Sequence, residues 1–105
     1  MTKEITIAVD AMGGDNSPKK IVEGINLHYK KSKNIFYKIF GDTNILNKIV
    51  PSGLPKEVYE LNHTYESVKD TDTPLSGAKK SKNTSMWLAI ESVKNKQSDI
   101  MISAG

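Results

Sequence analysis

The sequence has 105 residues, of which 37% are hydrophobic, and its formal net charge is +3 at pH 7. This length allows at most one domain with a modest core, and the sequence contains neither an apolar run long enough to cross a membrane nor a signal-peptide core. Because cysteine is absent, disulfides and thiolate chemistry are excluded, which is compatible with a cytoplasmic protein.

Strands and helices are expected to alternate along the chain, which predicts an α/β fold with a mostly parallel sheet flanked by helices. Runs of β-branched and aromatic residues predict strands at residues 5–10, 35–40, 60–65 and 99–103. Apolar residues at helical spacing predict helices at residues 18–31, 43–49 and 84–94.

Candidate caps and apolar faces are visible in the first and last of these helices. Ser17 is the expected N-cap of the first helix, with Pro18 at its first helical position, and Asn83 is the expected cap of the last. The expected apolar faces are Ile21, Val22, Ile25, His28 and Tyr29 in the first helix, and Met86, Ala89, Ile90 and Val93 in the last, with Trp87 at its edge.

Residues 7–18 carry the strongest functional signal. They combine a buried strand, a turn at Gly13 and Gly14, and a helix start. The two glycines allow a sharp turn and a close approach of the backbone to a ligand. Backbone N–H groups and the positive end of the helix dipole then converge on one spot that suits a phosphate or carboxylate. A purely structural turn is the alternative, and neither a dinucleotide fingerprint nor a P-loop is present.

Asp10 and Asp15 flank this turn. Two carboxylates can hold a metal or act as acid and base, but more often they accept hydrogen bonds from nearby backbone N–H groups and fix a turn. Because both would repel a phosphate, at least one is expected to point away from it or to pair with a lysine. We assign both a turn-shaping role. His28 and His63 lie far apart in sequence without metal-ligand spacing, so we interpret each as an ordinary packed or surface histidine and not as a ligand.

All 15 basic residues are lysines, which favours anionic partners in general, although an AT-rich genome produces the same bias. No nucleic-acid-binding motif accompanies them, so we expect no nucleic-acid partner. Lys79 and Lys82 lie in the polar segment 70–82, which is either a solvated connection or a loop beside an anionic ligand. Lysine binds phosphate as a point charge, without the fork of arginine. Thr84 and Ser85 follow, and their hydroxyls can cap a helix or join an anion site.

Ser103 ends the last predicted strand. Ligands of open α/β sheets bind beyond the carboxyl ends of the strands, so Ser103 is expected to line the ligand crevice. It is not expected to act as a hydrolase nucleophile, because the G-x-S-x-G elbow is absent.

Three segments in the correct order resemble the PlsX-type phosphate acyltransferases of bacterial phospholipid synthesis: residues 8–18 (AVDAMGGDNSP), 79–86 (KKSKNTSM) and 99–105 (DIMISAG). The resemblance implies a three-layer, Rossmann-like sheet similar to that of isocitrate and isopropylmalate dehydrogenases. It covers nearly all of this chain but only the first part of the family's length. Residues 1–105 are therefore expected to be the N-terminal part of a single α/β acyltransferase domain, incomplete at its C-terminus. In the basic segment 79–86, this sequence has lysine where members of the family often have arginine.

The resemblance also implies an activity without a required metal and without a cofactor: transfer of an acyl group from acyl carrier protein to inorganic phosphate, giving an acyl phosphate. The implied partners are acyl carrier protein, inorganic phosphate, a second copy in a homodimer and a downstream membrane glycerol-3-phosphate acyltransferase. The implied location is cytoplasmic, or peripheral at the membrane. The implied phosphate or substrate contacts are Gly13, Gly14, Asn16, Lys79, Lys82 and Ser103. Two alternatives stay open: a truncated, inactive fragment, and a non-catalytic module that binds an anion or a nucleotide.

Overall fold

The computed structural model describes residues 4–12, 18–32, 34–64 and 84–103. The strands within them are β1 (Ile5–Asp10), β2 (Ile35–Gly41), β3 (Tyr59–His63) and β4 (Ile100–Ser103). The helices are α1 (Lys19–Lys31), α2 (Thr43–Ile49) and α4 (Ser85–Lys94), with two short 3₁₀ turns, η1 (Val50–Ser52) and η2 (Lys56–Val58).

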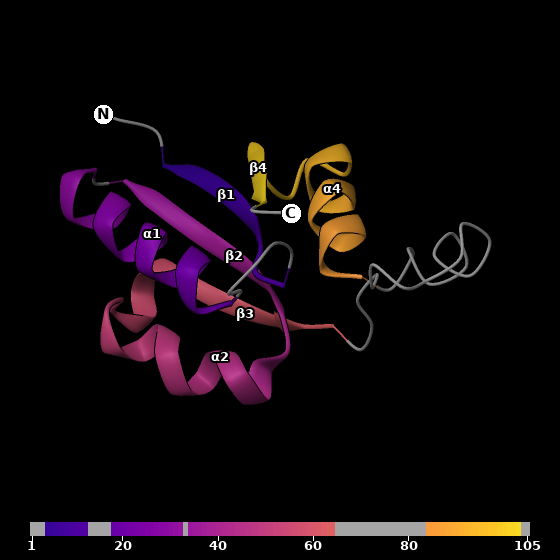
Figure 1. Cartoon of the computed structure of the whole chain (residues 1–105). Coiled ribbons are helices and arrows are strands. Elements are labelled where there is room, and N and C mark those ends of the chain that lie inside the picture. The colour runs from indigo at the N-terminus through magenta and orange to yellow at the C-terminus, as the bar shows by residue number, and fades with distance from the viewer. Residues whose placement is uncertain (1–3, 13–17, 33, 65–83, 104–105) are drawn as a thin grey trace.

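The four strands are parallel and lie in the order β3-β2-β1-β4 (Figure 1). From β1 the chain adds β2 and then β3 on one side, and it later returns to place β4 on the other side of β1. The order of strands therefore reverses between β1 and β4, which makes this the topological switch point of the sheet. The expected α/β fold with a parallel sheet is confirmed.

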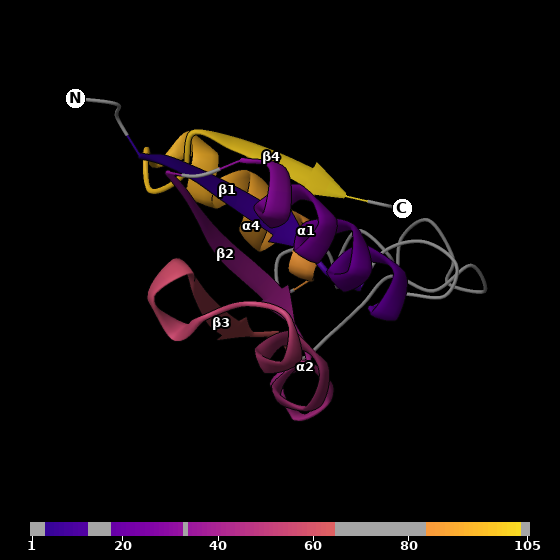
Figure 2. The same cartoon turned by 90° about the vertical axis from the view of Figure 1, so that its left-hand side faces the viewer.

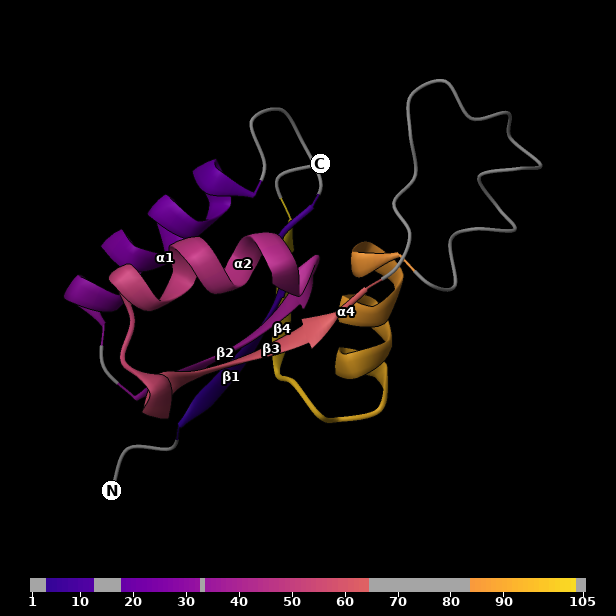
Figure 3. The ribbon, with the colours of Figure 1, turned by 90° about the horizontal axis from the view of Figure 1, so that it is seen from below.

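Helices cover both faces of the sheet, with α1 and α2 on one face and α4 on the other (Figure 3). The larger core lies on the face of α1 and α2, where Val9, Ile39 and Leu46 are fully excluded from solvent. On the opposite face, Ala89 of α4 packs with Ala8 and Phe40. Burial on both faces is typical of parallel sheets.

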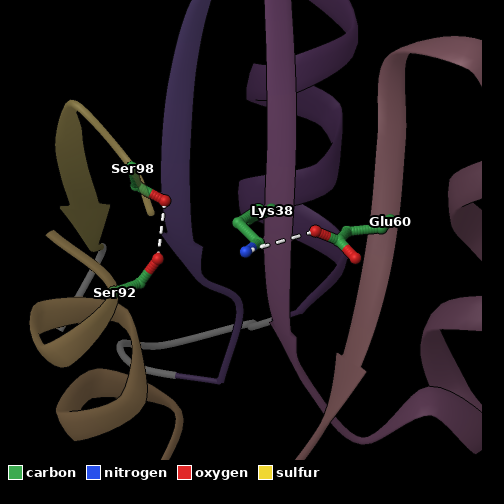
Figure 4. A network of polar contacts seen from close by, with 4 residues as sticks. All are labelled: Lys38, Glu60, Ser92 and Ser98. Carbon is green, nitrogen blue, oxygen red and sulfur yellow. Dashed lines mark hydrogen bonds and ion pairs between the residues drawn. The ribbon is translucent and has the colours of Figure 1, made fainter. Parts of the chain in front are cut away.

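Strand β4 is fixed to the rest of the sheet at its beginning. Ser92 near the end of α4 and Ser98 are both buried, and their hydroxyl oxygens lie 2.7 Å apart (Figure 4). Asp99 then exchanges hydrogen bonds with Thr6, whose N–H donates to the Asp99 carboxylate and whose carbonyl accepts from the Asp99 N–H, both at 2.8 Å. These contacts set the register of β4 against β1.

The helix starts differ from the predicted caps by one residue. Helix α1 begins at Lys19 with Pro18 in the N-cap position, so Pro18 is not the first helical residue, and Ser17 lies outside the described residues. The cap of α4 is Thr84 rather than Asn83, because the Thr84 side chain accepts a hydrogen bond from the Trp87 N–H at 3.2 Å.

The predicted apolar face of α4 is partly wrong. Met86 and Ile90 are 40% and 48% exposed, whereas Ser85, Ala89 and Ser92 are buried. Small side chains let the helix lie close to the sheet, and the two serines form hydrogen bonds there. A search for apolar periodicity misses a face of this kind because two of its members are polar.

Tyr37 is the largest side chain that the fold excludes from solvent. Its hydroxyl lies 2.7 Å from Nδ1 of His28. Burial, and to a lesser extent the neighbouring Tyr29, raises the pKa of Tyr37 above the ordinary value of 10.0. Because folding favours the neutral phenol, its contribution to stability is present below pH 10.0 and is lost as the pH rises from there towards the higher folded-state pKa.

We predict that Tyr37→Phe lowers the free energy of unfolding by about 1 kcal/mol near neutral pH, because the hydrogen bond to His28 is lost. The variant should also lose much of the decline in stability that the parent chain shows above pH 10. Urea unfolding at several pH values measures both effects. Tyr59→Phe, on the half-buried edge strand, is the control, and an equal change of the pH dependence in both variants would refute the assignment.

Candidate functional site

The candidate site lies at the carboxyl edge of the sheet, at the switch point between β1 and β4. Asp10 is the last residue of β1, Ser103 is the last residue of β4, and the two are direct partners in the strand pairing. Parallel strands place their carboxyl ends at the same edge, and ligands of open α/β sheets bind in the crevice at the switch point. The structure therefore brings two of the predicted site residues together where a ligand is expected.

The Asp10 carboxylate is the centre of this site and is only 1% exposed. One oxygen, Oδ1, accepts hydrogen bonds from the Ser85 hydroxyl and from the Met12 N–H, the latter at 3.1 Å. The other, Oδ2, accepts from the Ser103 hydroxyl at 2.7 Å. A buried carboxylate is costly unless it is well supplied with donors, and here three donors from three segments of the chain supply it.

Helix α4 contributes to this site through its first turn. Thr84 caps the helix, and the adjacent Ser85, its first residue, turns its hydroxyl to Asp10. The carboxylate therefore lies at the positive end of the helix dipole, where a negative charge is stabilised. The sequence left open whether the Thr84 and Ser85 hydroxyls cap the helix or join an anion site. In the structure Thr84 caps the helix and the Ser85 hydroxyl donates to Asp10, and a role of either in anion binding stays a prediction.

Ala11 and Met12 follow β1 directly at this cluster and lead towards the glycine turn. The Met12 N–H donates to the side chain of Asp10, which lies two residues earlier in the chain. A local hydrogen bond of this kind fixes the direction in which the backbone leaves the strand. The predicted residues Gly13, Gly14, Asp15 and Asn16 lie outside the described residues. The chain is described again from Pro18, which is buried at the start of α1.

Lys79 and Lys82 also lie outside the described residues. The segment that carries them joins Thr64, just after the carboxyl end of β3, to Thr84, beside Asp10. Thr64 and Thr84, the described residues that flank this segment, therefore both lie towards the carboxyl edge of the sheet.

The described residues contain no group of three histidine or acidic side chains that could hold a metal ion. None of the helices in the described part of the chain is both long and apolar enough to cross a membrane.

Comparison with known proteins identifies relatives of this sequence. The family described as "Fatty acid synthesis protein" matches residues 5–105. The chain is 62% identical over all of its 105 residues to the phosphate acyltransferase of Pelagibacter ubique, of which it covers 31%. It is 41% identical over 100 residues, 94% of the chain, to the phosphate acyltransferase of Streptococcus thermophilus, of which it covers 29%. The chain thus spans less than a third of the length of these relatives.

We predict that Asp10→Asn lowers the free energy of unfolding by about 1–3 kcal/mol. The neutral amide accepts weaker hydrogen bonds than the carboxylate. Its NH₂ group also faces a serine hydroxyl that donates to Asp10 in the parent chain, so two donors then face each other. Chemical denaturation of the 105-residue chain measures the change. Asp42→Asn is the matched control: the Asp42 side chain caps α2 by accepting from the Asn44 N–H at 2.9 Å, and asparagine caps equally well. Equal stability of the two variants would contradict the role given to Asp10.

Proposed function

The chain belongs to the family of fatty acid synthesis proteins, and we propose that it forms part of a phosphate acyltransferase. The proposed reaction transfers an acyl group from the thioester of acyl carrier protein to inorganic phosphate. Its product, an acyl phosphate, serves bacterial phospholipid synthesis. The names of the relatives support the class of activity, and residues 1–105 are proposed to be the N-terminal part of a single α/β acyltransferase domain.

One observation carries this proposal: buried Asp10 and Ser85 form a hydrogen-bonded cluster with half-buried Ser103 at the switch point, three residues before Gly13 in the sequence. The cluster holds the ends of β1 and β4 and the start of α4 in one arrangement. A turn that leaves such a fixed base can present its backbone N–H groups to an anion with little loss of conformational freedom.

We place the phosphate on the turn. Gly13, Gly14 and Asn16 contribute backbone or side-chain donors, while Lys79 and Lys82 neutralise charge from the segment that returns to the same edge. Ser103 lines the crevice at the end of β4. Asp10 and Asp15 shape the turn. This arrangement needs neither a metal nor a cofactor, because phosphate itself is the nucleophile.

In the proposed step, a phosphate oxygen attacks the thioester carbonyl carbon, a carbon–oxygen bond forms, and the carbon–sulfur bond breaks. The thiolate of the carrier protein leaves and takes up a proton. The protein contributes positioning of the phosphate and donors for the oxyanion that develops on the carbonyl oxygen. These tasks require no protein nucleophile, which fits a chain without cysteine.

The proposed partners follow from the reaction and the family. They are acyl carrier protein, inorganic phosphate, a second copy of the chain in a homodimer, and a membrane glycerol-3-phosphate acyltransferase that consumes the product. We place the protein in the cytoplasm or at the membrane surface, where that consumer works.

We predict that residues 1–105 alone do not produce acyl phosphate, whereas a completed chain does. The completed chain joins these residues to the part of the Pelagibacter ubique relative that they do not span. The measurement is acyl phosphate formation from acyl carrier protein thioester and phosphate. An inactive completed chain that unfolds cooperatively would refute the proposed reaction, and tight ATP binding by that chain would favour a nucleotide-binding module instead.

We predict that Gly14→Val abolishes saturation by phosphate in the completed chain, because a branched side chain blocks the close approach of the backbone. Steady-state kinetics at rising phosphate concentration measures this loss, and unchanged kinetics would remove the turn from the site.

We predict that the double variant Lys79→Gln/Lys82→Gln raises the KM for phosphate about tenfold or more with little change in kcat, since a charge contact of about 1.4 kcal/mol or more is lost. Lys48→Gln/Lys56→Gln, which removes two exposed lysines far from the switch point, is the matched control. An equal KM for phosphate in both double variants would show that Lys79 and Lys82 do not contribute to phosphate binding.

A further inference from the structure

We propose that the outer face of α1 is a docking surface for an acidic protein, and that this protein is the carrier that brings the acyl group. The proposal rests on the proposed function, since a reaction that takes its acyl group from a carrier protein requires a surface that binds the carrier. We define the α1 face as six residues of this helix: Lys19, Lys20, Glu23, Leu27, Lys30 and Lys31.

The α1 face forms one stripe along the helix. Successive residues of an α-helix are rotated by about 100°, so the six side chains fall within an arc of about 120°. All six are exposed. Figure 2 shows α1 in front of the sheet, and on its inner side Val22 and Ile25 are buried in the core. The stripe is therefore accessible to a partner along the whole helix.

The charge of the α1 face is positive. Four lysines stand against one glutamate, Glu23, and in the described part of the chain none of these five side chains takes part in an ion pair. Lys19 and Lys20 also occupy the first turn of the helix, which contains no acidic residue. Positive charge is unfavourable at that end of the helix dipole, so local helix stability does not account for these two lysines. An acidic partner compensates their charge.

Leu27 lies in the middle of the stripe and is 60% exposed. Its neighbours one turn away on the same side of the helix are Glu23, Lys30 and Lys31. Protein interfaces often centre on an apolar anchor within a polar rim, and the charges of the rim mainly steer the partner. The α1 face has this composition.

The size and composition of the α1 face favour a protein over a small anion or a lipid surface. The helix has 13 residues and is about 20 Å long, which exceeds the reach of a phosphate. A helix that inserts into a lipid surface presents a broad apolar face to it, whereas the broad apolar face of α1 is already packed against the sheet. A single exposed leucine among charged side chains fits a protein partner.

The position of α1 connects this surface to the proposed reaction. The chain leaves β1 at the carboxyl edge of the sheet and enters α1, which then leads back to the start of β2. The first turn of α1 therefore lies towards the edge that carries the candidate site, and its last turn lies towards the opposite edge. A carrier bound along the helix can thus present its thioester at the candidate site.

The test compares two acyl donors in the completed chain: the acyl thioester of the carrier protein, and an acyl thioester of pantetheine, which lacks the protein. Lys20→Glu/Lys31→Glu reverses two charges of the α1 face. Lys94→Glu/Lys96→Glu is the matched control, because these exposed lysines lie at and just beyond the end of α4, on the opposite face of the sheet. Each pair contains one lysine from the last turn of a helix, so the cost to the helix dipole is similar.

We expect Lys20→Glu/Lys31→Glu to raise the KM for the carrier thioester about tenfold or more, because like charges then face each other across the interface. The KM for phosphate and the rate with the pantetheine thioester should stay at the values of the control variant. Leu27→Ser should raise the KM for the carrier thioester severalfold without a change of charge, since it removes the apolar anchor.

An equal KM for the carrier thioester in the α1 variant and in the control would overturn the proposal. A comparable loss with both donors would also overturn it, because the lysines would then serve the fold or the active site. Lysine-dependent binding of the completed chain to phosphatidylglycerol vesicles, with an unchanged KM for the carrier, would assign the face to a membrane. A completed parent chain that is active with neither donor would refute the proposed reaction itself, and this inference with it.

Discussion

The buried carboxylate of Asp10 is the constraint on which the carboxyl edge of the sheet depends. It joins three segments that are distant in sequence, because its hydrogen bonds come from the residue after β1, from the start of α4 and from the end of β4. A charge this deeply buried is tolerated only while its donors stay in place. The position of α4 and the end of β4 are therefore coupled to the geometry at the end of β1. The same requirement explains why the packing face of α4 includes serine, which shortens the apolar stripe of that helix.

The fold was largely predictable because the chain alternates strongly between β-branched runs and helical patterns. The limits of β1 and α2 agree with the predicted ranges, and the other strands differ by one or two residues at their ends. The errors concern the start of α1, where Pro18 is the N-cap and not the first helical residue, and α4, where Thr84 replaces Asn83 as the cap and Met86 and Ile90 are exposed. The cap of α4 is decided locally by the hydrogen bond from the Trp87 N–H to Thr84; threonine and asparagine are both good caps, so their order in the sequence did not distinguish them. The exposure of Met86 and Ile90 has a long-range origin, because contacts with the sheet decide which residues of α4 face inward and the local sequence contains no information on those contacts.

The candidate site was predictable in position and less so in its contacts. Asp10 and Ser103 were both named from the sequence, since each ends a predicted strand, but their direct bond depends on β4 returning beside β1. Strand order is a long-range property that local patterns do not encode. Ser85 was recognised only as one of two hydroxyls at a helix start, because its partner lies 75 residues away. The residues of the glycine turn and the lysine segment remain predictions from the sequence and from family resemblance.

A buried carboxylate beside a proposed phosphate site first looks unfavourable, since the two charges repel. The geometry reduces this conflict. The negative charge of Asp10 is shared among two hydroxyls and a backbone N–H and faces the positive end of α4. Because Ser85 and Ser103 give their protons to Asp10, they have no proton left with which to bind an anion. In the proposed site, the positive charge for phosphate is therefore assigned to the glycine turn, the α1 dipole and the lysines, and Ser103 is left to line the crevice without donating its proton to the anion.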